Sequence, residues 1–88
     1  MKLARCFVRY EPEIGDGTMF LFNKETGKML EGDYYSYIII RSLIDAIDLE
    51  TLAKEISSEN GWSLLDVQND INGIICTLKN IGFIKEDS

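Results

Sequence analysis

The first third of the chain alternates between strand-like and turn-like patterns. Residues 3–10 place apolar side chains at every second position, which predicts a strand with one face on a core and the other toward water. Residues 11–17 concentrate proline, glycine and aspartate and predict a turn. Residues 18–23 are apolar on both faces, as in a central strand. A compact hairpin loop over residues 23–27 then leads into a short last strand, residues 28–31.

Three helical periodicities follow, each with a capping residue ahead of it. The first has its apolar face at positions 35, 39, 43 and 46 and is expected to end near Ile47. The second is shorter and is expected to stop at Gly61. The third is the longest, and its wide apolar stripe consists of Val67, Ile71, Ile74, Ile75, Leu78 and Ile81. The expected N-caps of the three helices are Asp33, Asp48 and Ser63.

These elements predict an α+β fold. A small β-meander of three strands over about residues 3–31 is followed by three amphipathic helices over about residues 33–81. The 88 residues, with 45% apolar and 10% aromatic composition, fit a single domain, 1–88, with a modest core. Residues 85–88 are expected to form a short solvated tail. Trp62 is expected to be a core aromatic that covers the joint between helices.

The last strand is the best candidate for a binding site, because nothing that follows it is expected to cover its edge. An extended peptide can satisfy the unpaired backbone groups of an edge strand, and neighbouring apolar pockets can select its side chains. We expect Ile75 and Leu78 in the core, whereas Val67, Ile71 and Ile74 fit either the core or a partly exposed flank beside the strand. The same edge could instead pair two copies of the chain as a dimer-forming adaptor.

Charge argues against nucleic acid as a partner. The net charge is −6, and residues 45–88 hold the whole excess, with nine acidic and three basic side chains. Nucleic-acid binding needs Lys and Arg against phosphates. A winged-helix DNA-binding regulator is still the main alternative, although its recognition helix would carry Asp66 and Asp70 against Lys79 alone. Such acidity mostly serves solubility, and its functional interpretation is a basic peptide partner.

Little in the sequence supports catalysis, cofactor binding or metal binding. There is no histidine, and Cys6 and Cys76 lack the CxxC spacing of a metal site. Both cysteines are expected to be small buried side chains in a reducing compartment, with a disulfide between them left open. Carboxylates such as Asp66 and Asp70 are expected to be solvated or capping groups rather than an acid and a base. Without a signal peptide or a membrane-length apolar stretch, the protein is expected to be cytoplasmic.

The order of several short motifs resembles the PqqD-like family. The motifs are Leu21-Phe-Asn-Lys-Glu-Thr-Gly27, the spacing of Ser36, Ile39 and Leu43, the string Asp48-Leu-Glu-Thr-Leu52, Asp70-Ile71 with Ile74, Ile75 and Leu78, and Gly82-Phe-Ile84. The resemblance covers roughly residues 4–84. The family commonly has an apolar residue followed by asparagine where the last strand meets the first helix, and this chain departs from it with Gly32-Asp33.

That family contains the leader-recognition elements of pathways for ribosomally synthesised, post-translationally modified peptides. The resemblance implies a small three-stranded antiparallel β-sheet followed by a three-helix winged-helix-like bundle, which acts as a non-catalytic clamp. The leader of a precursor peptide would add to the third strand and lie in the cleft beside the third helix. By position, the pairing strand is Lys28, Met29, Leu30 and Glu31, and the helix wall is Val67, Asp70, Ile71 and Ile74. It also implies a separate maturation enzyme as partner, such as a radical-SAM enzyme, a leader peptidase of lasso-peptide pathways or a cyclodehydratase. The clamp itself would be a monomer or a strand-paired homodimer.

Overall fold

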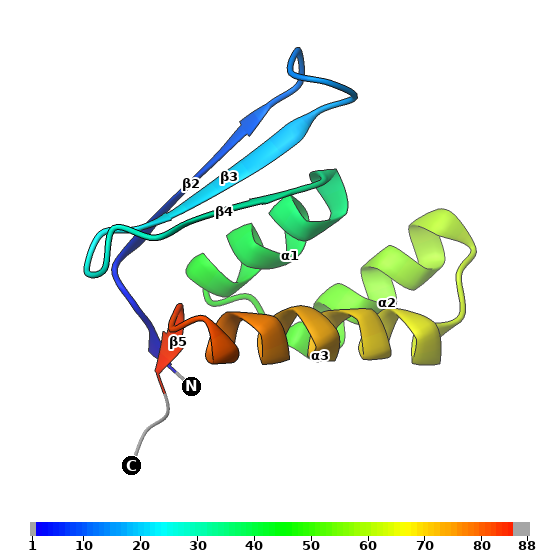
Figure 1. Ribbon diagram of the computed structural model, residues 1–88. Coiled ribbons are helices and arrows are strands. Elements are labelled where there is room, and N and C mark those ends of the chain that lie inside the picture. Colours follow the sequence, from blue (N-terminus) through cyan, green and yellow to red (C-terminus); the bar gives the residue numbers. More distant parts are fainter. Residues whose placement is uncertain (1, 86–88) are drawn as a thin grey trace.

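The computed structural model describes residues 2–85 and contains a three-stranded sheet, three helices and a small second sheet (Figure 1). Along the chain the elements are β1 (Lys2–Leu3), β2 (Cys6–Glu11), β3 (Thr18–Asn23), β4 (Met29–Gly32), α1 (Tyr34–Ile44), α2 (Leu49–Asn60), α3 (Leu64–Asn80) and β5 (Ile84–Lys85). The predicted α+β class is confirmed, because an antiparallel sheet in the order β2-β3-β4 is followed by three helices.

The antiparallel register sorts the residues of this sheet onto two faces. Met19 and Leu21 of β3 belong to the core and are buried. On the opposite face Phe7, Phe22 and Met29 are aligned across the three strands and stay exposed. Figure 1 shows the helices on one side of the sheet, so β3 is covered on one face rather than on both.

All three predicted N-caps are confirmed by side-chain bonds to the first turn of each helix. Asp33 Oδ1 accepts from the Ser36 amide at 2.8 Å, and Asp48 and Ser63 accept in the same way ahead of α2 and α3. The bond from the Ser36 amide holds the pKa of the Asp33 carboxyl below its ordinary value. Gly61 ends α2 at φ 66°, the left-handed conformation that the predicted stop requires.

The first helix is shorter than its apolar pattern predicts. α1 ends at Ile44, and Ala46, which was expected on the inward face, is exposed at φ 57°. The amide of Ile47 donates to the Ser42 carbonyl at 2.9 Å, and that of Ala46 to the Leu43 carbonyl at 3.2 Å. These bonds form a Schellman motif, which normally has glycine at the left-handed position. The sequence concealed this stop because alanine occupies that position.

The core lies between the sheet and the helices. α1 packs against β2 and β3, and α2 packs against α1 and α3. Tyr10, Tyr34 and Tyr37 form an aromatic cluster, with ring centroids 5.0, 5.4 and 6.1 Å apart, that fastens β2 to α1. The buried apolar residues are Met19, Leu21, Ile39, Ile40, Leu43, Leu52, Ala53, Ile56, Val67, Ile71, Leu78, Phe83 and Ile84.

A second sheet, which the sequence did not predict, joins the two ends of the described chain. β1 pairs antiparallel with β5, so that Leu3 lies opposite Ile84. The expectation of a solvated tail is therefore wrong for Lys85, which belongs to β5, and residues 86–88 lie outside the described residues. Strands of two residues are too short to show an alternating pattern, so no periodicity could have predicted them.

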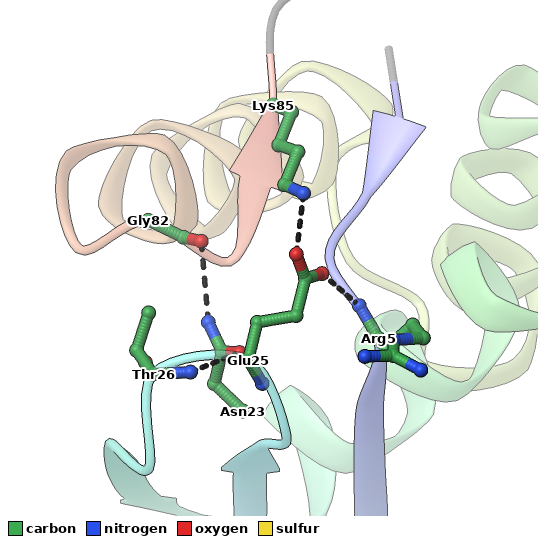
Figure 2. A network of polar contacts seen from close by, with 6 residues as sticks. All are labelled: Arg5, Asn23, Glu25, Thr26, Gly82 and Lys85. Atoms are coloured by element: carbon green, nitrogen blue, oxygen red, sulfur yellow. Dashed lines mark hydrogen bonds and ion pairs between the residues drawn. The ribbon is translucent and has the colours of Figure 1, made fainter.

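A polar network ties the turn before β4 to the end of α3 and to β5 (Figure 2). Asn23 is fully buried, and its Oδ1 accepts from two amides of the turn at 2.8 and 3.2 Å while its Nδ2 donates to the Gly82 carbonyl at 3.3 Å. The Glu25 carboxylate accepts from Lys85 Nζ at 2.5 Å and from the Arg5 amide at 2.7 Å. The bond from Lys85 is the main reason that the pKa of Glu25 is lowered.

Candidate functional site

An open cleft of about 640 Å³ lies between β4 and α3. Its apolar lining includes Met19 from β3, Ile40 from α1 and Leu78 from α3. β4 contributes Leu30 and Glu31 to one wall. The other wall belongs to α3, and its members Asp70, Gly73, Ile74 and Thr77 are spaced at i, i+3, i+4 and i+7, which places them on one face of the helix.

The backbone of β4 presents hydrogen-bonding groups to this cleft. In the part of the chain that the structure describes, β4 pairs with β3 alone. The Lys28 carbonyl accepts from the Asn23 amide at 2.8 Å, and the side of bonding alternates with each residue along an antiparallel strand. The N–H and C=O groups of Met29 and Glu31 therefore face the open edge. β2 is also an edge strand, but it contributes no residue to the lining of the cleft.

The structure brings four of the eight predicted site residues together in the cleft: Leu30, Glu31, Asp70 and Ile74. Lys28 and Met29 lie at the start of the strand edge, exposed and outside the lining. Val67 and Ile71 do not line this cleft, although Val67 lines the smaller pocket beside it. They are 0% and 3% exposed and form part of the core.

The burial of Val67 and Ile71 follows from helix geometry. Val67, Ile71 and Leu78 share the face of α3 that packs into the core, whereas Asp70 and Ile74 lie to one flank of that face. Ile74 is accordingly half-buried, touching both the core and the cleft. Ile75 is half-buried on the other flank, and Leu78 is in the core as expected.

Gly73 is a cleft residue that the sequence analysis missed. A Cβ built on Gly73 meets no atom within 4 Å, so the residue opens onto free space. Glycine inside a helix costs about 1 kcal/mol relative to alanine, and no neighbour here requires it. The result is a low point in the α3 wall where the backbone of another chain can approach. The sequence offered one sign of this role: Gly73 lies three residues after Asp70, which places both on the same face of the helix.

The junction between β4 and α1 explains the departure at Gly32. A Cβ at Gly32 would lie 2.8 Å from the terminal methyl of Met19 and 3.2 Å from Ser36 Cβ. Met19 therefore fills the space that an apolar side chain would need at this position. Asp33 follows as the helix cap and lines the same end of the cleft.

Tyr35, another residue that the sequence analysis left out of the site, contacts Asp70 across the cleft. The Tyr35 hydroxyl donates to Asp70 Oδ2 at 3.2 Å. Burial, together with the Asp70 carboxylate, raises the pKa of Tyr35 to about 12, so the phenol stays a neutral donor at physiological pH. Trp62 packs on Tyr35 with ring centroids 5.5 Å apart. The expected core role of Trp62 is wrong, since the residue is 48% exposed.

The two cysteines differ in their exposure. Cys6 and Cys76 are unpaired thiols. Cys76 is exposed, which contradicts its expected burial, and the pKa of the half-buried Cys6 is raised by desolvation. Among residues 2–85 no cluster of His, Cys, Asp and Glu side chains could hold a metal ion. None of the described helices is both long and apolar enough to cross a membrane.

Comparison with known proteins bears on the fold. No protein-family model matches the chain, and no curated protein matches it. Among solved structures, the chain is similar to that of TbiB1 in complex with the TbiA(beta) leader peptide, with a TM-score of 0.76 and 20% sequence identity. The likeness covers 100% of this chain and 99% of that chain. The chain therefore shares its fold, over its whole length, with a protein whose structure contains a leader peptide.

Proposed function

We propose that this protein captures the leader of a ribosomally made precursor peptide by strand addition to β4. The observation that carries the proposal is the open backbone edge of Met29 and Glu31 beside an apolar cleft walled by α3. The shared fold with a leader-bound protein supports it. The DNA-binding alternative gains no support, because the charged side chain of α3 in the cleft, Asp70, is a carboxylate.

The clamp acts without chemistry of its own in this proposal. By holding the leader, it raises the effective concentration of the core segment at a separate maturation enzyme, such as a radical-SAM enzyme, a leader peptidase or a cyclodehydratase. The strand edge and the cleft fix the orientation of the leader. The protein would act in the cytoplasm, where precursor peptides are synthesised.

A second surface supports contact with such an enzyme. Phe7, Phe22 and Met29 are 50%, 40% and 62% exposed and form a continuous apolar row on the sheet face away from the helices. Arg5 and Lys24, joined by a backbone bond of 2.8 Å, border the row and are exposed. An enzyme surface that pairs apolar side chains with carboxylates fits this face. Replacing Phe22 with serine should slow maturation while leaving leader affinity unchanged, and equal maturation rates would reject this surface.

Leader binding is tested with two aspartate substitutions on the same helix. Ile74→Asp places a charge in the cleft on a half-buried position, and Leu65→Asp is the matched control on an exposed position outside the cleft, 65% exposed. We expect Ile74→Asp to weaken binding of the leader encoded beside this gene at least tenfold, and Leu65→Asp to change it less than twofold. Wild-type-like circular dichroism spectra are required of both variants, to show that they fold. Equal leader affinities of Ile74→Asp and Leu65→Asp would show that the leader does not bind in the cleft.

Strand addition makes a sharper demand on the peptide. A leader that pairs with β4 must turn alternate amides toward the strand, so N-methylation should weaken binding at every second position and spare the positions between. Each lost bond is worth about 0.5–1.5 kcal/mol, or roughly a 2- to 13-fold loss, with steric clash in addition. A helical leader would instead show sensitivity with a period of three to four residues. That result would keep a peptide clamp and reject strand addition.

A further inference from the structure

A second pocket of about 470 Å³ continues the cleft beyond the end of β4. It shares Tyr35 and Asp70 with the cleft, so it adjoins the cleft at the hydrogen bond between these two side chains. It lies between the start of α1 and the start of α3, and the chain that enters α3 supplies Trp62. Asp66, one helical turn before Asp70, also lines it.

The chemistry of this pocket is aromatic and acidic. Trp62 and Tyr35 form the aromatic part, with ring centroids 5.5 Å apart and Trp62 48% exposed. Asp66 and Asp70 supply two carboxylates, and Asp33 adds a third at the adjoining end of the cleft. Among the described residues that line the two hollows there is no lysine or arginine.

Two features of this arrangement point to a cationic occupant. Carboxylates at i and i+4 on a helix repel each other, and a cation beside them relieves the repulsion. An exposed indole packed on a phenol offers a π face that attracts ammonium and guanidinium groups. Asp66 lies in the first turn of α3, where the helix dipole offsets part of its charge, so Asp70 contributes most of the attraction.

We propose that this pocket is a subsite for a lysine or arginine side chain of the bound leader. The inference rests on the proposed function, since the leader that pairs with β4 brings its cation to the pocket. The basic residue would lie outside the pairing segment, beyond the end that adjoins Gly32 and Asp33. The acidic excess of the helical half, nine acidic against three basic side chains in residues 45–88, favours the same partner charge.

A double-mutant cycle tests the proposal. Each lysine and arginine of the leader encoded beside this gene is replaced in turn by glutamine, and each peptide is titrated into the wild-type protein and into Asp70→Asn. The asparagine keeps an acceptor for Tyr35 and removes the charge. Glutamine at one of the basic positions should weaken binding of the peptide to the wild-type protein about 3- to 30-fold. The same peptide should bind Asp70→Asn less than 2-fold more weakly than the unchanged leader does. Glu50→Gln, which removes a charge on α2 away from the pocket, should leave the loss unchanged.

Trp62 gives a direct optical readout, because it is the only tryptophan in the chain. The wild-type leader should change its fluorescence, and the glutamine peptide should bind with a smaller change. Equal losses in the wild type and Asp70→Asn, or tight binding of a leader that has no lysine or arginine, would overturn the subsite and leave the leader clamp intact. A wild-type leader that does not bind at all would overturn the proposed function and the subsite together.

Discussion

Replacing Asn23 with alanine should destabilise the protein substantially without touching the cleft. Asn23 is 0% exposed and makes three side-chain bonds, two from amides of the β3-β4 turn and one to the Gly82 carbonyl (Figure 2). At about 0.5–1.5 kcal/mol each, these bonds total roughly 1.5–4.5 kcal/mol. The turn is exposed, so water can replace part of what is lost, and we expect a loss of about 2–3 kcal/mol.

Equilibrium urea unfolding followed by far-ultraviolet circular dichroism measures this loss. A chain of 88 residues has a total stability of about 4–13 kcal/mol, so the expected change is a large shift of the unfolding midpoint. Asn72→Ala is the matched control, because Asn72 is exposed on α3 and alanine there should be neutral or slightly stabilising. Asn23→Asp keeps the acceptor but buries a carboxylate that faces the Gly82 carbonyl, so at neutral pH it should destabilise the fold at least as much as alanine. A loss below about 0.5 kcal/mol for Asn23→Ala would refute the structural role of the network.

Three further predictions follow from the same structure. Gly73→Ala should stabilise the protein by about 0.5–1 kcal/mol in urea unfolding and weaken leader binding, because the new methyl fills the low point of the wall; unchanged binding would place the peptide elsewhere. The lowered pKa of Glu25 means that its bond to Lys85 stabilises the fold above the ordinary carboxyl pKa and is lost as the pH falls through the lowered value. Glu25→Gln should therefore flatten stability against pH in that acid range, and an unchanged profile would contradict the pairing. Ile71→Asp should abolish the native circular dichroism spectrum, because it places a charge in the core. A variant that folds but no longer binds the leader would show that Ile71 lines the binding cleft instead.

The large elements could be predicted because each has its own local signal. The caps Asp33, Asp48 and Ser63 and the left-handed Gly61 mark their boundaries through hydrogen bonds that their own residue types make. The early end of α1 at the left-handed Ala46 could not be predicted from residue type. It depends on a backbone motif that usually uses glycine.

The lining of the cleft was harder to predict than the fold, because it depends on how far α3 is rotated. An apolar stripe marks the residues that avoid water, but it does not show which flank faces the strand. Val67 and Ile71 were assigned to the wall and lie in the core, whereas Gly73 lines the wall with no apolar side chain to mark it. Trp62 was expected to cover the joint between helices in the core, and it instead packs on Tyr35 with 48% of its surface exposed.

Backbone amide shifts on titration with the leader would test the central claim most directly. The labelled protein is titrated with the leader half of a short peptide encoded beside its gene and, separately, with duplex DNA. We expect shifts concentrated at residues 28–31 of the β4 edge and at residues 69–78 of α3, with the leader and not with duplex DNA. Shifts confined to other surfaces, or shifts with duplex DNA and none with the leader, would contradict it.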